Sequence, residues 1–447
     1  MYLETLVIEN IRGFRTGSSP IRLDFGRPDG SYSGLTVIAG RNGSGKSTLL
    51  RAIALAIAGP STARTLMPGY SGWISEGEST ARVEAAFSQG ADDAFGSGGA
   101  PPKSRPWAGL QWTSDFPGAL AEMEESIPKS SAKLTARRGP WLENPNGWFL
   151  AGYGPFRRLN GAAAEAQRSM LGSKRTAALV TLFDESASLA ESTWWMQELY
   201  PKQLEGDATS KRINEDVQRM LNDGLLPDGT TVTRYTSDGL WVEQGGAEVV
   251  LEEMSDGYRV VAALVIDILR RLYAFYGRLV ILEDNEGGVY CPHEGVVLID
   301  EVDVHLHVGW QQRIGFWLRD HFPKIQFIVS THSPFVAQAA SANGLLRLPA
   351  PTDASRVPNF LEEPLFSEIV NGDADRVSMS HLFGLESTYS DETLERRRRW
   401  SDMEDEEMGS VPSDDLRELR ASLGISPSDD VERALRSLDE TLRAEDA

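Results

Sequence analysis

The sequence GRNGSGKS, at Gly40–Ser47, decides the fold of this 447-residue chain. Glycines at these spacings let the backbone wrap around the phosphates of a nucleotide, and the amides that begin a following helix supply positive field. Lys46 can reach the β- and γ-phosphate oxygens, and Ser47 can offer its hydroxyl to Mg²⁺. We therefore expect ATP and Mg²⁺ to bind at Gly40, Arg41, Asn42, Gly43, Ser44, Gly45, Lys46, Ser47 and Thr48.

The flanks of this loop predict the strand and the helix that a phosphate-binding loop requires. Leu35–Ala39 is a short apolar run followed by glycine, which is typical of a buried strand. Ser47–Ala58 is apolar and favours a helix, and Gly59-Pro60 should end that helix. Because the motif lies between a strand and a helix, a glycine-rich turn that matches by chance is the weaker explanation.

A second motif, VVLIDE at Val296–Glu301, is typical of the metal- and water-binding half of such a site. Its apolar residues predict a buried strand that delivers Asp300 and Glu301 to the site. Asp300 can help to hold Mg²⁺, and Glu301 can act as the base or orienter of the attacking water. A strand that ends in two acids is by itself usually a solvated strand end, so this interpretation depends on the phosphate-binding loop.

Two further segments resemble parts of the ABC-type ATPases. MSDGYR at Met254–Arg259 precedes a long helical pattern and resembles the signature with which one subunit grips ATP bound by another. The candidate contacts in this segment are Ser255, Asp256 and Gly257. The plain alternative is an ordinary helix N-cap by Ser255 or Asp256. STHSP at Ser330–Pro334 follows a third apolar run, and His332 resembles the switch histidine that contacts the γ-phosphate.

The resemblance narrows to the SMC/RecF-like ATPases of bacterial defence, which include the ATPase subunits of Septu and retron-associated systems and are related to the OLD ATPase domain. It is carried by IDEVDVHLHVGW at Ile299–Trp310, QFIVSTHSP at Gln326–Pro334, YGPFR at Tyr153–Arg157 and IENIRGF at Ile8–Phe14. The resemblance implies that Arg12 contacts the nucleotide and that Asp303 works across a dimer.

The chain departs from the family pattern at three places. Met254 and Val308 stand where leucine and proline are usual, and we expect neither to touch the chemistry. The YGPFR segment occupies the place of a Q-loop but contains no glutamine. The resemblance therefore does not identify the residue that couples the metal to movement of the lid.

The resemblance implies an α/β fold of the ABC-type ATPase head class. This is a mixed sheet with a phosphate-binding loop, flanked by helices, with a lid-like insertion and a C-terminal helical region. We expect four regions: an N-terminal ATPase lobe at 1–88, a lid at 89–250 that includes the Q-loop-like segment 148–160, a C-terminal ATPase lobe at 251–350 and an acidic helical region at 351–447. Other strands are expected at Leu3–Glu9, Ile21–Phe25, Trp148–Tyr153 and Ile325–Val329, a hairpin at Thr231–Glu243, and helices at Ala187–Tyr200, Arg212–Leu221 and Gly257–Tyr276.

Composition limits the class of protein. The net charge is −21, which gives no general attraction to nucleic acid, although 15 acids and 5 bases between residues 401 and 447 account for about half of it. The single cysteine, Cys291, fits a reducing compartment. Val260–Leu282 contains four charges that a membrane span does not tolerate, and the first residues lack the basic region of a signal peptide. We expect a cytoplasmic protein.

We find no nuclease motif in the sequence. Asp373-Ala374-Asp375 lacks an upstream glutamate strand and is interpreted as a loop, and the six histidines are too dispersed for a metal site. The resemblance thus implies an ATP-dependent dimer that controls a separate effector, such as an HNH-type nuclease, and leaves DNA or retron-type RNA/DNA open as a further partner. A RecF-like DNA repair ATPase is the main alternative. A transporter subunit is weaker because of the missing glutamine and the insertion at Glu283–Gly295.

The acidic C-terminal region predicts two helices, at Ser413–Leu423 and Pro427–Arg443, each with one apolar stripe. In the first helix the stripe consists of Leu416, Leu419 and Leu423. Such stripes can pack on the core of the chain itself, or they can dock a partner such as the effector that the chain lacks.

Overall fold

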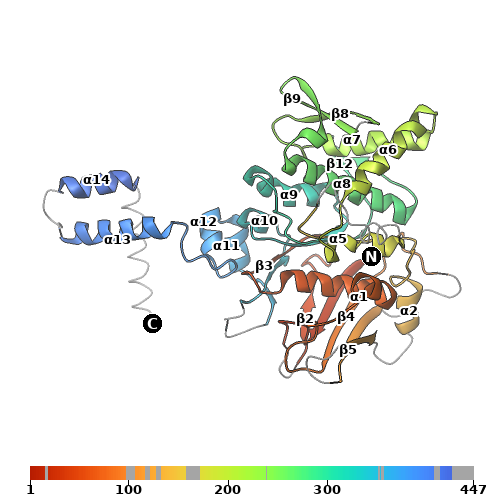
Figure 1. Ribbon diagram of the computed structural model, residues 1–447, viewed down its shortest axis with the longest axis horizontal. Helices are drawn as coiled ribbons and strands as arrows, with labels where there is room; N and C mark the ends of the chain where they lie inside the picture. Colours follow the sequence, from red (N-terminus) through yellow and green to blue (C-terminus); the bar gives the residue numbers. More distant parts are fainter. Residues whose placement is uncertain are drawn as a thin grey trace. The chain divides into compact units, whose positions relative to one another are not determined.

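The computed structural model describes residues 1–15, 19–96, 106–115, 121–126, 132–157, 172–237, 239–350, 353, 357–406 and 413–424. The chain divides into two compact units, Met1–Gly384 and Leu385–Ala447. The first unit contains the phosphate-binding loop, the acidic strand end and both ABC-like segments, and Figure 1 shows its sheets and helices.

A six-stranded sheet forms the centre of the first unit (Figure 1). Its strand order is β16 (Asn359–Phe360), β15 (Leu345–Arg347), β3 (Gly34–Ala39), β14 (Ile325–Ser330), β13 (Gly295–Ile299) and β7 (Leu150–Tyr153). All neighbours are parallel except β16, which runs antiparallel to β15. The predicted apolar strands are confirmed as β3, β7, β13 and β14. Because parallel strands place their carboxyl ends at one edge, the segments that follow β3, β13 and β14 meet there.

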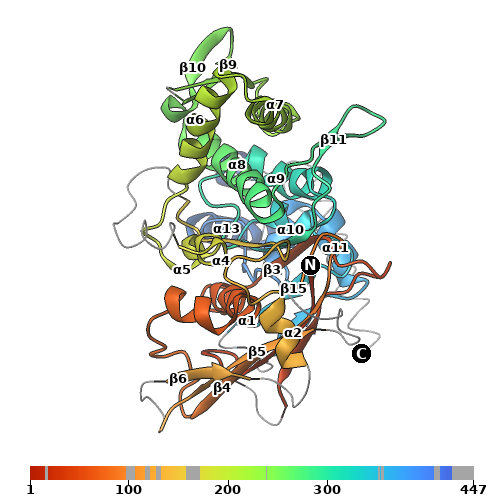
Figure 2. The same ribbon diagram turned by 90° about the vertical axis from the view of Figure 1, so that its right-hand side faces the viewer.

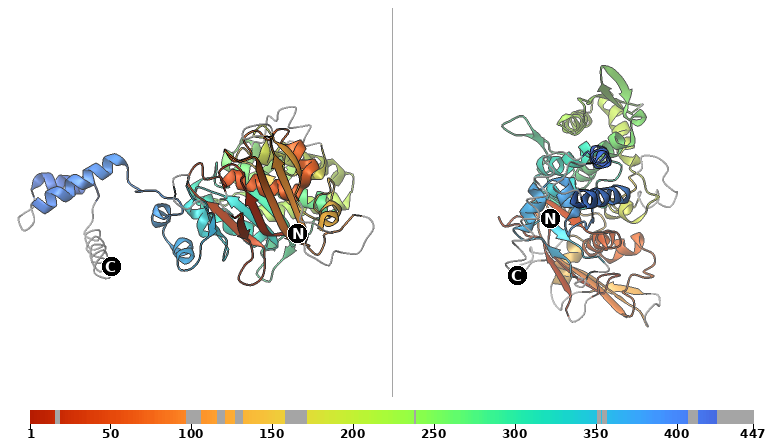
Figure 3. Two further views of the ribbon diagram at one scale, coloured as in Figure 1. Left: turned by 90° about the horizontal axis from the view of Figure 1, so that it is seen from below. Right: turned by 90° about the vertical axis from the view of Figure 1, so that its left-hand side faces the viewer.

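A second, antiparallel sheet covers one side of the first unit. Its order is β2 (Ile21–Asp24), β1 (Tyr2–Glu9), β4 (Thr80–Ser88), β5 (Trp107–Thr113) and β6 (Glu122–Glu125). The pairing of β1 with β2 runs from Thr5 opposite Asp24 to Ile8 opposite Ile21, and both strands were predicted from the sequence. The left view of Figure 3 shows these strands side by side.

Helix α1 (Lys46–Leu66) lies between the two sheets, as Figure 2 shows. The parallel sheet is buried on both faces, and successive residues of one strand belong to different cores. Ile38 of β3 packs in the core that contains α1 and the antiparallel sheet, whereas Val37 and Ala39 pack in the core on the opposite face. This alternation explains why β3 reads as an unbroken apolar run.

Helix α1 consists of two helical stretches that meet in a kink at Gly59, which confirms the predicted end of the first stretch at Gly59-Pro60. Gly59 has a φ of 82° and interrupts the regular path, and a second helical stretch then runs to Leu66. A β-carbon at Gly59 would lie 2.5 Å from Cγ of Trp141, which leaves room only for glycine. Pro60 opens the second stretch, a position that its fixed φ and missing N–H suit well.

Helices cover the other face of the parallel sheet. The longest is α8 (Asp256–Tyr276), which confirms the predicted helix at Gly257–Tyr276, and its neighbours α6 (Ala190–Leu204) and α7 (Ala208–Asn222) confirm two more. Among the described residues of this unit, the other helices are α2 (Ala132–Arg138), α4 (Lys174–Ala177), α5 (Val180–Phe183), α9 (Val308–His321), α10 (Pro334–Gln338), α11 (Leu365–Asn371), α12 (Ala374–Met379) and the 3₁₀ turn η1 (Leu251–Glu253). Within the described ranges, no helix is long and apolar enough to cross a membrane.

Two small sheets complete the first unit. The three-stranded sheet has the order β10 (Ala247–Val250), β9 (Gly239–Gln244) and β8 (Thr231–Thr236), and β11 (Leu282–Glu283) pairs with β12 (Val289–Tyr290). Strands β8 and β9 confirm the predicted hairpin, with Thr236 paired to Gly239 at its turn.

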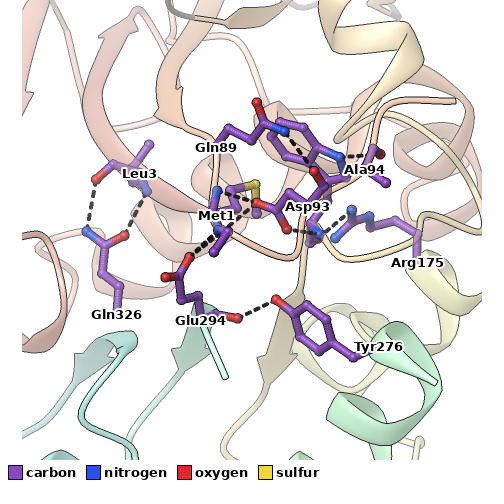
Figure 4. A network of polar contacts seen from close by, with 12 residues as sticks. Met1, Leu3, Gln89, Asp93, Ala94, Arg175, Tyr276, Glu294 and Gln326 are labelled. Carbon is purple, nitrogen blue, oxygen red and sulfur yellow. Dashed lines mark hydrogen bonds and ion pairs between the residues drawn. The ribbon is translucent and has the colours of Figure 1, made fainter. Parts of the chain in front are cut away.

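Buried polar contacts join the two large sheets (Figure 4). The Gln326 side chain in β14 accepts a hydrogen bond from the Leu3 amide at 2.7 Å and donates one to the Leu3 carbonyl at 2.9 Å. Nearby, the Asp93 carboxylate accepts hydrogen bonds from the amides of Gly90 and Trp148. Since an unpaired buried amide or carboxylate is costly, these pairs fix how the sheets sit against each other.

The segment after β16 corrects one prediction. Asp373-Ala374-Asp375 was expected to be a loop, but Asp373 is the N-cap of α12, where its carboxylate accepts a hydrogen bond from the amide of Arg376 at 2.8 Å. The two acids therefore begin a helix, which is the ordinary use of aspartate at such a position.

The second unit contains α13 (Asp391–Glu406) and α14 (Asp414–Ser422). Helix α14 confirms the first predicted tail helix, and Ser413 caps it by accepting a hydrogen bond from the amide of Leu416 at 3.2 Å. Leu416 is buried against Trp400 of α13, with the other leucines of the stripe packed alongside. The first apolar stripe thus packs within this unit, and the helix predicted at Pro427–Arg443 lies outside the described residues.

Candidate active site

The phosphate-binding loop joins the end of β3 to the start of α1. Gly43 and Gly45 have φ values of 78° and 97°, so the loop uses a backbone conformation that glycine adopts without strain. Gly45 is the N-cap residue of α1 and lies against the ring of Phe14, which a β-carbon would approach to 3.1 Å. Helix α1 therefore begins at Lys46, with its first amides directed toward the loop.

Lys46 lies at the centre of the loop and is only 7% exposed. Its Nζ donates hydrogen bonds to the carbonyls of Gly40 at 2.9 Å and Arg41 at 3.3 Å. Burial lowers the pKa of Lys46, and the negative charges of Glu301, Asp300 and Asp303 oppose that shift. The structure thus places the lysine of the loop within electrostatic reach of all three acids at the end of β13.

Asp300 and Glu301 follow β13 and are joined through Ser330, the last residue of β14. The Ser330 hydroxyl donates to Oδ1 of Asp300 at 2.5 Å and accepts from the Glu301 amide at 2.8 Å. The Asp300 amide donates to the carbonyl of Tyr153 in β7 at 2.8 Å. Neighbouring strands on both sides therefore hold the two acids, and Asp300 is 2% exposed.

Glu301 adopts a φ of 48°, in the left-handed region that non-glycine residues seldom occupy. Burial raises the pKa of its carboxyl, and the charges of Asp300 and Asp303 raise it further. The positive charges of Lys46 and Arg157 act in the opposite direction. A carboxylate with a raised pKa is a better proton acceptor near neutral pH, as a general base requires.

Asp303 and His332 lie in two turns that are hydrogen-bonded to each other. Oδ1 of Asp303 accepts from the Thr331 hydroxyl at 2.5 Å and from the His332 amide at 3.3 Å. His332 is exposed overall, and partial desolvation of the ring and the charge of Lys46 lower its pKa. The segments after β13 and β14 thus form one structure beside the phosphate-binding loop.

Arg157 also belongs to the site, although the sequence motif YGPFR that contains it predicted no role for it. The Arg157 guanidinium, 2% exposed, donates to the carbonyls of Asp300 at 3.0 Å and Glu301 at 3.0 Å. The YGPFR pattern contains the one signal that could have identified it, since an arginine directly after a buried strand needs acceptors when it stays buried.

The signature-like segment forms the start of α8. Ser255 is the N-cap residue by position, but its hydroxyl makes no side-chain capping hydrogen bond, and both Ser255 and Asp256 are exposed. Gly257 is buried, and a β-carbon there would lie 2.5 Å from the ring of Trp310. The glycine therefore allows α9 to approach the first turn of α8, and the exposed Ser255 does not use its hydroxyl to cap the helix.

Two predicted nucleotide contacts, Arg12 and Arg41, contact other parts of the first unit. Arg12 has a φ of 47°, stacks over the ring of Trp73 at 5.3 Å and has its pKa lowered by burial and by Arg51. Arg41 belongs to the loop, yet its guanidinium donates to the Gly384 carbonyl at 2.6 Å. Arg41 therefore fastens the loop to the end of the first unit.

The side chains at this edge fit a nucleotide with Mg²⁺. Asp300 and Ser47 offer oxygen donors of the kind that Mg²⁺ prefers, and the remaining ligands usually come from phosphates and water. The buried Oγ of Ser44 has no hydrogen-bond partner in the described part of the chain, so the loop keeps a polar atom for a phosphate. Across those same residues, no group of three or more His, Cys, Asp and Glu side chains is arranged to hold a metal ion.

The parallel sheet, the loop after β3 and the acids after β13 define an ABC-type P-loop ATPase head. Two family models agree with this class. Residues 5–92 match an "AAA domain" model, and residues 198–337 match the model described as "AAA domain, putative AbiEii toxin, Type IV TA system". The first range contains the phosphate-binding loop, and the second contains the signature-like segment, the acids and His332.

Two proteins named as parts of retron and Septu systems are similar to parts of this chain. The retron Vc95 probable ATPase of Vibrio cholerae serotype O1 biovar El Tor is 39% identical over 126 residues, which are 28% of this chain and 22% of that protein. The Septu protein PtuA of Bacillus thuringiensis is 30% identical over 135 residues, which are 29% of this chain and 32% of that protein. The matched segments thus span less than a third of either relative.

A solved structure has a more distant similarity. The SMC head domain from Thermotoga maritima aligns with 81% of this chain and 100% of that domain, at 17% identity and a TM-score of 0.44.

Proposed function

We propose that this chain binds and hydrolyses ATP as the ATPase subunit of a cytoplasmic antiphage defence assembly. In this proposal it works as an ATP-dependent dimer and controls a separate effector, such as an HNH-type nuclease. One observation supports hydrolysis above all. Ser330 joins Asp300 to Glu301, and both acids lie within electrostatic reach of Lys46.

Each residue has a defined part in the proposed reaction. Lys46 and the amides of its loop would neutralise the β- and γ-phosphate oxygens, and Asp300 with the Ser47 hydroxyl would hold the metal. Bound Mg²⁺ would supply Lewis-acid stabilisation of the charge on the phosphates. Glu301 accepts a proton from the attacking water, and His332 contacts the γ-phosphate. The base should contribute roughly 10²- to 10⁴-fold to the rate.

The dimer part of the proposal rests on the signature-like segment. Ser255 and Asp256, at the start of α8, are exposed and available to a nucleotide held by a second copy. Ser255→Arg should then block turnover while the variant still binds ATP at its own loop. When it is mixed with Lys46→Ala, the mixed dimer contains one intact composite site and should regain activity.

The matched control is a second mixture, in which the Ser255→Arg protein is exchanged for a double variant that carries both Ser255→Arg and Lys46→Ala. That mixture contains no intact phosphate-binding loop and should stay inactive. If the first mixture never regains turnover, a signature that acts across the dimer is refuted. A helix N-cap alone would predict only a stability loss of about 1 kcal/mol in Ser255→Arg.

The defence part is supported by the similarity to the Septu and retron proteins and is tested in cells. The gene should be expressed with its neighbouring genes, and the efficiency of phage plating compared between wild type and Lys46→Ala. We expect protection that the variant abolishes, and copurification should identify the effector. Suppose instead that deleting the gene leaves the efficiency of phage plating the same as in the parent strain but makes the cells sensitive to DNA damage. That result would support a repair ATPase.

A further inference from the structure

Arg157 makes an unusual set of contacts in the first unit. It lies four residues beyond the end of β7, and its guanidinium is buried under the turn that follows β13. Nη1 and Nη2 together donate to five main-chain carbonyls, those of Gly154 at 3.2 Å, Asp300 at 3.0 Å, Glu301 at 3.0 Å, Val302 at 3.3 Å and Val304 at 3.5 Å. Four of these carbonyls belong to one short turn.

Burial of this guanidinium is costly, so its partners have to compensate. Burial lowers the pKa of Arg157 to about 10, against the charges of Asp303, Asp300 and Glu301, so the group stays charged at neutral pH. A buried charge persists only where hydrogen bonds and opposite charges offset its desolvation. Here the bonds go to main-chain carbonyls rather than to a carboxylate, so they act on the backbone of the turn.

The turn that Arg157 holds has a backbone conformation that needs support. Glu301 has a φ of 48°, in the left-handed region, and a non-glycine residue keeps such a conformation only where its surroundings over-determine it. The guanidinium is a planar fork of donors with fixed geometry, which suits several carbonyls that converge on one point. A lysine ammonium at the end of a flexible chain lacks that geometry.

We propose that Arg157 is a positioning residue for ATP hydrolysis, which holds the turn at Asp300–Val304 so that the Glu301 carboxylate faces the attacking water. The inference rests on the proposed ATPase function and adds a residue to that site. Arg157 touches no phosphate or metal in this proposal. It acts through the backbone, and a misplacement of about 1 Å in a reacting group can cost 10²-fold in rate.

The experiment measures kcat, KM and ATP binding for Arg157→Met and Arg157→Lys, together with thermal unfolding. We expect kcat to fall by about 10²-fold in both variants, because neither side chain supplies the fork. KM and ATP binding should stay near the wild-type values, since Lys46 and its loop are untouched. Arg157→Lys keeps the charge, so it remains informative if Arg157→Met fails to fold.

Arg175 provides a matched control. It is fully buried like Arg157 and donates to the carbonyls of Pro140 and Trp148, away from the three acids. Arg175→Met should lower the unfolding temperature and leave kcat of the folded protein unchanged. A general effect of losing a buried arginine would instead give both methionine variants the same kinetics.

Two outcomes would overturn the inference. One is a wild-type kcat in Arg157→Lys, and the other is equal kcat in Arg157→Met and Arg175→Met. The outcome that refutes the ATPase function is different, namely wild-type protein whose ATP turnover does not exceed that of Lys46→Ala. If wild type hydrolyses ATP and Arg157→Lys has the same kcat, only the positioning role of Arg157 is refuted.

Discussion

Replacing Asp267 by asparagine tests the buried polar cluster that ties α8 to the parallel sheet. Asp267 is fully buried in α8, and its carboxylate accepts hydrogen bonds from Tyr153 Oη at 2.9 Å and Arg271 Nε at 2.5 Å. Arg270 donates to its other oxygen at 2.9 Å and 3.1 Å. Tyr153 ends β7, next to β13, so this carboxylate links the helix of the signature-like segment to the strand of the catalytic acids.

The expected magnitude follows from burial. Asp267→Asn keeps the size of the side chain but removes the charge that compensates Arg271, whose side chain is 5% exposed. Removing one partner of a buried ion pair costs about 3–5 kcal/mol. Tyr153→Phe removes a single hydrogen bond and should cost about 1 kcal/mol.

Urea unfolding followed by tryptophan fluorescence measures both losses. The control is Glu283→Gln, which breaks an exposed pair with Arg219 and should cost no more than about 1 kcal/mol. If Asp267→Asn loses no more stability than Glu283→Gln, the buried cluster does not stabilise the fold in the way we infer.

The same cluster predicts how stability depends on pH. Burial alone would raise the pKa of Asp267, but the charges of Arg271 and Arg270 outweigh it and lower the pKa below its ordinary value. A carboxyl with a lowered pKa in the folded state stabilises the fold above its unfolded pKa of about 3.9. This contribution should disappear as the pH falls from about 4 toward the folded pKa. Asp267→Asn should lack it, and a variant with the wild-type acid dependence would contradict the assignment.

Two further predictions concern the kink in α1 and the second unit. Gly59→Ala should lower the free energy of unfolding by more than Gly72→Ala does. Both glycines have a positive φ, whose strain costs about 1–3 kcal/mol in alanine, but only at Gly59 does the new β-carbon clash with Trp141. Equal losses of stability in the two variants would refute the clash. Removal of 385–447 should leave ATP turnover intact and abolish copurification of an effector, whereas aggregation or lost turnover would show that this unit stabilises the ATPase.

The parts of the site that are local in sequence were the parts that could be predicted. The phosphate-binding loop and VVLIDE each combine an apolar strand with polar residues at its end, and both were recognised from a few consecutive residues. The order of strands is not local. Strand β3 lies between β14 and β15, which follow it by about 300 residues, and only the packed sheet shows this.

The residues that support the site could not be predicted for the same reason. Arg157 resembles any charged residue after a strand until the carbonyls of a turn 143 residues away converge on it. Asp267 was counted among the charges that exclude a membrane span, while its partner Tyr153 lies 114 residues away. The break in α1 was predicted from Gly59-Pro60, but the packing of Trp141 against Gly59 was not, because Trp141 lies far along the chain.

ATP turnover and bound nucleotide in wild type, Lys46→Ala and Glu301→Gln test the proposed site most directly. Lys46→Ala should neither bind nor hydrolyse ATP, because it loses the charge that neutralises the phosphate oxygens. Glu301→Gln should bind ATP and Mg²⁺ but turn over about 10²- to 10⁴-fold more slowly, so that ATP accumulates on the protein. Wild-type turnover in either variant would contradict the assignment of the phosphate-binding loop or of the catalytic base.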